Sequence, residues 1–212
     1  MLTLSGAAGA DRDRAVLVAV SAAKRGDLVL LPTESVYALA TDPFSRRGVL
    51  AIREAKHQAE NSPLPLMVPT AMTVSGIATG VTPLVQALME AFWPGPLTLL
   101  LPPQPSLAWD LPSGLPVTVR MPLHPLTLAI LDRTGPLVVT AANVPGLPAP
   151  VSIDAALEQL GECAAVAIDV GELEADALPS TVVDVTGGIP HVLRHGALSV
   201  TLLREVVPEI TE

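Results

Sequence analysis

The fold is decided by the stretch Val138-Val139-Thr140-Ala141-Ala142-Asn143-Val144-Pro145-Gly146, which passes directly from β-branched residues to small and turn-forming residues. This pattern predicts a strand that ends abruptly. In open α/β sheets ligands bind beyond the carboxyl ends of strands, where small residues let a ligand approach the main chain. Asn143 can both donate and accept hydrogen bonds there. The stretch therefore predicts a binding site at a strand end, although an ordinary strand-to-loop exit has the same local chemistry.

Helices and strands are expected to interleave on both sides of this stretch. Apolar spacing and end signals predict helices over residues 11–25, 48–56, 82–92, 125–131, 153–160 and 199–206. Short apolar or β-branched runs predict strands at 28–31, 97–101, 117–120, 165–170, 181–185 and 191–193. Five prolines predict a loop over 102–116. Because the late strands follow one another closely, we expect an α/β fold with a mixed sheet and helices packed on it.

Composition limits the class of protein. Half of the 212 residues are hydrophobic and the mean hydropathy is +0.51, yet no apolar run reaches the ~18 residues that a membrane span needs. The N-terminus lacks the basic-then-apolar pattern of a signal peptide. A single cysteine, Cys163, excludes an internal disulfide framework. We therefore expect a cytoplasmic protein with no membrane partner.

The charge balance argues against extended nucleic-acid binding. The net charge of −9 opposes the phosphate neutralisation on which affinity for DNA and RNA largely depends. This net charge is nevertheless compatible with a small basic pocket that binds a nucleotide. The four histidines are not at zinc-finger or His-Glu-x-x-His spacing, and there is no Walker P-loop, GxGxxG motif or nucleophile elbow. We expect no protein-bound metal.

Polar or basic residues recur just beyond the predicted strands or at a helix end. They are Thr33 and Ser35, Lys56, Arg120, Thr140 and Asn143, Ser180 and Thr181, and Arg194. Arginine can bind a carboxylate or a phosphate through a bidentate fork, so the set suits an anionic ligand. Each residue also has a simpler interpretation. Lys56 can face a helix dipole, the hydroxyls can satisfy backbone groups, and the two arginines can pair with Asp110, Asp184 or Glu205.

Six segments follow in a fixed order along the chain. They are Leu31-Pro32-Thr33-Glu34-Ser35-Val36-Tyr37, Phe92-Trp93-Pro94-Gly95-Pro96-Leu97-Thr98, Val119-Arg120-Met121-Pro122, Ala142-Asn143-Val144-Pro145-Gly146, Ser180-Thr181-Val182-Val183-Asp184 and Leu193-Arg194-His195-Gly196. Together they resemble the YrdC-like threonylcarbamoyl-AMP synthase family over residues 12–205, and the second and fifth are the most specific. The resemblance implies one YrdC-like domain over residues 1–212, with a twisted mixed sheet around a deep cavity.

The resemblance also implies an activity. Members of the family join L-threonine, bicarbonate and ATP into threonylcarbamoyl-AMP and pyrophosphate, for modification of adenosine 37 in tRNA. Carried over by position, Thr33, Arg120 and Ser180 would bind L-threonine, with Arg120 as the carboxylate clamp. ATP would be bound by Lys56, Gln58, Ser62, Thr140, Ala141, Asn143 and Arg194. No covalent nucleophile is implied. Mg²⁺ would accompany ATP, and a downstream transferase rather than this acidic chain would contact tRNA.

Several positions depart from the family pattern. Gln58 stands where an arginine is usual after the lysine, and Ala141 replaces the serine of Ser-x-Asn. Ala38 replaces a glycine, and Met67 stands where some members have histidine. A charge-assisted hydrogen bond contributes about 1.5–3 kcal/mol, so losing one weakens the site for the triphosphate. Two alternatives therefore stay open: a paralogue that binds nucleotide or amino acid without turnover, and an enzyme acting on another carbamoyl-adenylate.

Overall fold

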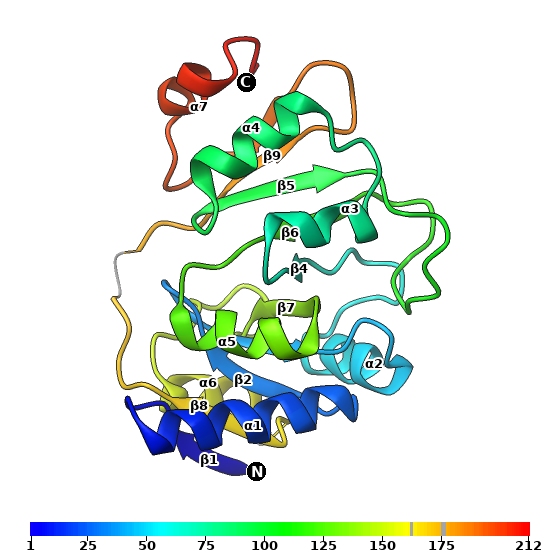
Figure 1. The fold of residues 1–212 in the computed structure, drawn as a ribbon. Coiled ribbons are helices and arrows are strands. Elements are labelled where there is room, and N and C mark those ends of the chain that lie inside the picture. Colours follow the sequence, from blue (N-terminus) through cyan, green and yellow to red (C-terminus); the bar gives the residue numbers. More distant parts are fainter. Residues whose placement is uncertain (162, 175–176) are drawn as a thin grey trace.

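The strand at the predicted position, β7 (Leu137–Ala141), lies inside the sheet between β3 (Tyr37–Thr41) and β4 (Leu66–Met67). The structure is a computed structural model that describes residues 1–161, 163–174 and 177–212. Within these residues the strand order is β1-β8-β2-β3-β7-β4-β6-β5-β9-β10. Figure 1 labels these strands except β3 and β10. The other strands are β1 (Leu2–Ser5), β2 (Val29–Pro32), β5 (Leu97–Leu101), β6 (Val117–Arg120), β8 (Val166–Asp169), β9 (Thr181–Asp184) and β10 (His191–Arg194).

The sheet is mixed, as predicted. β1, β8 and β2 run parallel to one another, and β3 and β7 each pair antiparallel to their neighbours. β4 is parallel to β6, β5 is parallel to β9, and antiparallel pairs join β6 to β5 and β9 to β10. This order brings the ends of β6, β5, β9 and β10 together, although their residues lie far apart in the sequence.

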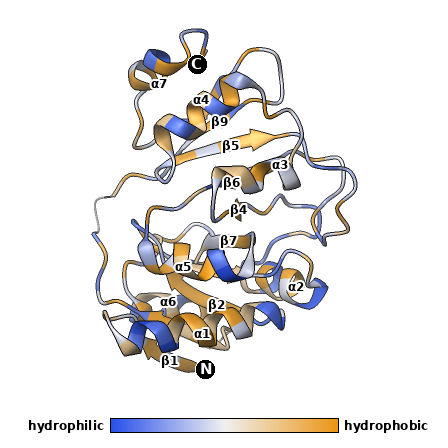
Figure 2. Cartoon of the chain, viewed as in Figure 1, coloured by the Kyte–Doolittle hydropathy of each residue, from blue (hydrophilic) through white to orange (hydrophobic). Residues whose placement is uncertain are grey.

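Two buried clusters lie on opposite faces of the sheet. In β2, Leu30 belongs to one cluster while Val29 and Leu31 belong to the other, because successive side chains of a strand alternate between faces. Helices α1 (Ala10–Lys24) and α5 (Pro125–Thr134) pack into the cluster of Val29 and Leu31. The other cluster takes side chains from α2 (Arg46–Ala55), α3 (Val74–Ile77), α4 (Pro83–Phe92), α6 (Ile153–Leu160) and α7 (Val200–Val206). Figure 2 shows the contrast between hydrophobic β2 and β5 and the mixed surface of α1.

Helix starts follow the capping chemistry in the sequence. The side chains of Thr82, Ser152 and Ser199 accept hydrogen bonds from backbone N–H groups at the starts of α4, α6 and α7. α2 begins earlier than the predicted residue 48, because the Ser45 hydroxyl accepts a hydrogen bond from the Gly48 N–H at 3.2 Å and caps the helix there. α5 continues beyond the predicted residue 131 and ends at Thr134, before Gly135 with φ of 82°.

Four elements, β1, β3, η1 and α3, were not predicted. β3 is buried along its whole length, so it lacks the apolar–polar alternation that marks a half-buried strand. β1 is a largely exposed strand, held by its parallel pairing with β8. The 3-10 turn η1 (Ala71–Thr73) and α3 follow β4 and are too short for a helical period to be visible.

Candidate functional site

A cavity of about 480 Å³ is lined by residues of β3, β4, β5, β6, β7, β9 and β10 and of the segments 33–36 and 177–180. Six of the ten predicted site residues line it: Thr33, Arg120, Thr140, Ala141, Ser180 and Arg194. Ser35, Thr98 and Thr118 add hydroxyl groups, while Met67 and Val139 are among the apolar residues of its wall. The volume falls within the roughly 300–1,000 Å³ typical of small-molecule sites. The topology therefore gathers polar side chains from β5, β6, β7, β10 and two loops around one hollow.

The Thr33 hydroxyl holds the turn between β2 and β3. It donates to the Val36 carbonyl at 2.7 Å and accepts from the N–H groups of Ser35 and Val36 at 3.3 and 3.1 Å. Thr33 is buried, so its side chain shapes this wall through local hydrogen bonds. Ser35, the next residue but one, also lines the cavity from this turn.

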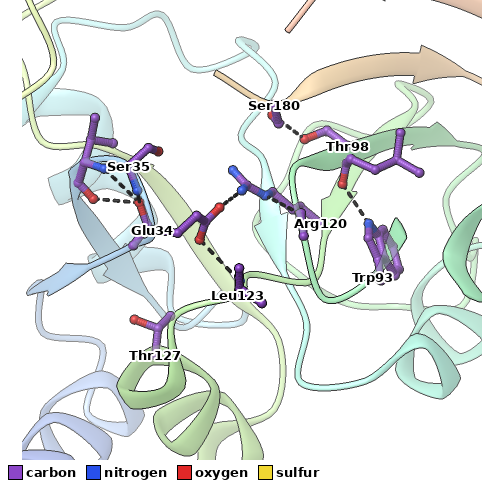
Figure 3. A network of polar contacts seen from close by, with 12 residues as sticks. Glu34, Ser35, Trp93, Thr98, Arg120, Leu123, Thr127 and Ser180 are labelled. Atoms are coloured by element: carbon purple, nitrogen blue, oxygen red, sulfur yellow. Dashed lines mark hydrogen bonds and ion pairs between the residues drawn. The ribbon is translucent and has the colours of Figure 1, made fainter. Parts of the chain in front are cut away.

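Arg120 ends β6 and is held by two fixed groups (Figure 3). Its Nε donates to the Gly95 carbonyl at 3.0 Å, and its Nη2 forms an ion pair with Glu34. Burial, and secondarily the charge of Arg194, lowers the pKa of Arg120 to about 10. Arg120 thus remains a cation near neutral pH, in a setting where water screens its charge poorly.

Ser180 is held between β5 and β10. Its hydroxyl lies 2.8 Å from the Thr98 hydroxyl (Figure 3), and Arg194 Nη2 donates to it at 3.0 Å. Arg194 also donates through Nε and Nη2 to the Ser180 carbonyl, at 3.1 and 2.9 Å. The interpretation in which Arg120 and Arg194 pair with Asp110, Asp184 or Glu205 is wrong, since these two arginines bind Glu34, Gly95 and Ser180 instead.

Gly196 lies against the backbone that carries Ser180, and Gly196→Ala is expected to distort it. An added Cβ would stand 2.2 Å from the Pro179 carbonyl oxygen and 2.6 Å from Ser180 C. Overpacking of this kind costs roughly 1–3 kcal/mol. Urea unfolding should therefore show a lower midpoint for Gly196→Ala than for Gly188→Ala, whose added Cβ meets nothing within 4 Å. Equal midpoints for the two variants would contradict the close approach.

Lys56 lies beside the strand-end stretch rather than in the cavity wall. Its Nζ donates to the Ala141 carbonyl at 2.7 Å, to Asn143 Oδ1 at 2.8 Å and to the Asn143 carbonyl. Asn143 Nδ2 in turn donates to the Leu147 carbonyl at 2.7 Å. Lys56 is 4% exposed, and burial lowers its pKa to about 8. The three donors of the ammonium thus hold the segment that follows β7, and the helix-dipole interpretation misses these partners.

Gln58 and Ser62 lie in the turn after α2 and are not among the residues that line the cavity. The Gln58 N–H donates to the Arg53 carbonyl, while the buried Gln58 Oε1 has no hydrogen-bond partner among the described residues. Arg53, which sequence reasoning missed, donates from Nη1 to the Ala59 carbonyl at 2.8 Å and fixes this turn. The sequence pattern that could have identified Arg53 is its spacing of four residues from Val49, which puts both side chains on the buried face of α2.

His57 stands in this turn with a positive φ of 48°. A left-handed backbone is uncommon for a residue other than glycine.

Among the described residues, no group of three His, Cys, Asp or Glu side chains is placed to hold a metal ion. No described helix is both long enough and apolar enough to span a membrane.

Comparisons with known proteins agree with this architecture. The sequence model of the Sua5/YciO/YrdC protein family, which carries the description "Telomere recombination", matches residues 21–196. A putative threonylcarbamoyl-AMP synthase of Mycobacterium tuberculosis (strain ATCC 25618 / H37Rv) is 40% identical over 197 residues, which cover 92% of this chain and 90% of that protein. A threonylcarbamoyl-AMP synthase of Pyrococcus abyssi (strain GE5 / Orsay) is 32% identical over 92% of this chain and 58% of its own length.

A solved structure of Pyrococcus abyssi Sua5 complexed with L-threonine has the same fold. It matches with a TM-score of 0.88 and 29% identity over 100% of this chain and 62% of that one. This chain therefore spans less than two thirds of the Pyrococcus protein. The predicted α/β fold with a twisted mixed sheet is confirmed.

Proposed function

The chain belongs to the Sua5/YciO/YrdC family, and on that basis we propose that it is an enzyme that joins L-threonine, bicarbonate and ATP into threonylcarbamoyl-AMP and pyrophosphate. In this reaction the threonine amine and bicarbonate form a carbamate with loss of water. A carbamate oxygen then attacks the α-phosphorus of ATP, and pyrophosphate leaves. The work of the protein is to position the reactants and to stabilise developing charge.

One observation carries the proposal: two guanidinium groups and a hydroxyl pair face the same cavity. Arg120 and Arg194 line it together with Ser180, whose hydroxyl lies 2.8 Å from that of Thr98. Arg120 suits the carboxylate of L-threonine, because a guanidinium binds a carboxylate through two parallel hydrogen bonds. We assign Thr33 and Ser180 to the same amino-acid end, Thr33 through the turn that it holds.

We place ATP along the Thr140–Ala141 wall, with Arg194 facing its phosphates. Lys56 and Asn143 contribute by fixing the segment after β7, and Gln58 and Ser62 lie in the adjoining turn. We expect Mg²⁺ to enter with ATP, bound by phosphate oxygens, which this hard cation prefers. The product would pass to a threonylcarbamoyl transferase, because a net charge of −9 disfavours direct contact with tRNA. We place these steps in the cytoplasm, which suits a chain with one cysteine.

The direct test uses purified protein with ATP, Mg²⁺, bicarbonate and radiolabelled L-threonine. We expect pyrophosphate and a labelled adenylate, both of which require all four components. Omission of bicarbonate is the control, since no carbamate forms without it. If ATP or threonine binds while neither product appears, the chain is a binding protein of this family and the proposed activity is wrong.

The double change Gln58→Arg with Ala141→Ser is expected to tighten ATP binding about tenfold or more. It adds a cation and a hydroxyl, and one charge-assisted hydrogen bond contributes about 1.5–3 kcal/mol. Isothermal titration with Mg-ATP measures the change. Gln86→Arg on the exposed side of α4 is the matched control, because it adds the same charge away from the cavity. Equal affinity of the double variant and the control would contradict the assignment of this turn to ATP.

A further inference from the structure

Glu34 connects two segments that meet beside the cavity. Its Oε1 forms the ion pair with Arg120 Nη2, and its Oε2 accepts a hydrogen bond from the Leu123 N–H at 3.2 Å (Figure 3). Both side chains of the pair are largely buried, with 12% of Arg120 and 19% of Glu34 exposed. The turn between β2 and β3 is thereby joined to the segment between β6 and α5.

The position of Glu34 relative to the cavity indicates what the pair does. Thr33, Ser35 and Arg120 line the cavity, whereas Glu34, between the first two, does not. The Glu34 carboxylate therefore binds Arg120 from outside the cavity and does not occupy the cavity. Since the Gly95 carbonyl fixes Nε and Glu34 fixes Nη2, the direction of the guanidinium plane is set by two contacts.

The charges around Arg120 show why such a contact is needed. Arg194 is close enough to lower the pKa of Arg120, and it is anchored to Ser180 by three hydrogen bonds, so it cannot turn away freely. Two like charges repel, and water screens this repulsion only in part, because Arg120 is largely buried although Arg194 is exposed. Glu34 offsets that repulsion on one side and leaves the rest of the guanidinium for a ligand.

We propose that Glu34 is a positioning residue for Arg120, and that it sets the preference of the site for an amino acid with a free carboxylate over the corresponding uncharged amide. The inference rests on the proposed function, in which Arg120 binds the carboxylate of L-threonine. A planar guanidinium recognises a carboxylate only when its fork is aligned with the two oxygens. Loss of Glu34 should therefore weaken carboxylate binding more than amide binding.

The test compares L-threonine with L-threoninamide in the full chain, by isothermal titration. For Glu34→Gln we expect the preference for L-threonine over L-threoninamide to fall about tenfold, because the charge is lost while the shape of the side chain is kept. Glu34→Asp, which keeps the charge, should retain part of the preference. Glu90→Gln on exposed α4 is the matched control and should behave as wild type. A merely structural role would weaken both ligands equally and would overturn the inference.

A second measurement does not depend on threonine. Hydrogen exchange at Arg120 Nε, followed by NMR, should be faster in Glu34→Gln than in wild type, because the side chain has lost one of its two anchors. If wild type binds no threonine, the proposed function fails, and this exchange rate alone decides whether Glu34 positions Arg120. Unchanged exchange overturns the inference. Tighter threonine binding in Glu34→Gln also overturns it, since Glu34 would then be a competitor of the ligand carboxylate.

Discussion

Arg120→Ala is expected to raise the Kd for L-threonine about 100-fold or more and to abolish threonine-dependent release of pyrophosphate. Truncating one partner of a buried, hydrogen-bonded charge pair costs about 2–5 kcal/mol, much of it from the charge left unpaired. Here the change removes the proposed carboxylate clamp and also leaves Glu34 without its ion pair. Titration with L-threonine measures the first effect, and a pyrophosphate assay measures the second.

Three controls separate this loss from unfolding. Mg-ATP affinity of Arg120→Ala should stay within about threefold of wild type if the site for the nucleotide is intact. Arg120→Lys should bind L-threonine weakly but measurably, because lysine keeps the charge and lacks the planar fork. Arg133→Ala, at an exposed position of α5, should leave both affinities unchanged. Normal threonine affinity in Arg120→Ala would contradict the assignment of the amino-acid end.

The sequence was most informative where one residue type determines local backbone chemistry. Ser152 and Ser199 mark the starts of α6 and α7, because capping depends on neighbours within a few positions, whereas the end of α5 before Gly135 lies three residues beyond the predicted end. β3 was not predicted, although it is an interior strand of the sheet. Its Ala-Leu-Ala core has neither alternation nor β-branched residues, so only pairing with β2 and β7 makes it a strand.

The composition of the cavity wall could be anticipated better than its contacts. Arg120 and Arg194 are the last residues of β6 and β10, but their proximity depends on the order β6-β5-β9-β10, which no local pattern specifies. The same holds for Glu34, whose partner Arg120 is 86 positions away, and for Lys56, whose acceptor Ala141 is 85 positions away. Residues placed on the ATP side by resemblance alone, such as Gln58, remain predictions.

Lys56→Met is expected to weaken Mg-ATP binding by at least tenfold. It should also remove the pH dependence that Mg-ATP affinity shows near pH 8 in wild type. The charged ammonium satisfies three acceptors in the segment 141–143, and methionine has the length of lysine without any donor. Because burial lowers the pKa of Lys56 to about 8, the wild-type ammonium loses its proton within an accessible pH range. A neutral amine has two N–H donors, so one of the three contacts is lost and ATP binding should weaken from pH 7 to pH 9.

Stability should change in the opposite direction over the same range, which distinguishes a site effect from unfolding. Between pH 8 and 10.5 the unfolded chain keeps the proton on Lys56 that the folded chain has lost. The unfolded state then binds more protons, so the contribution of Lys56 to the free energy of unfolding rises with pH. The difference in free energy of unfolding between wild type and Lys56→Met, measured by urea unfolding at pH 7 and pH 9, isolates this contribution. If ATP affinity and this difference fall together as pH rises, the assigned role of Lys56 is wrong, since loss of the fold would explain both.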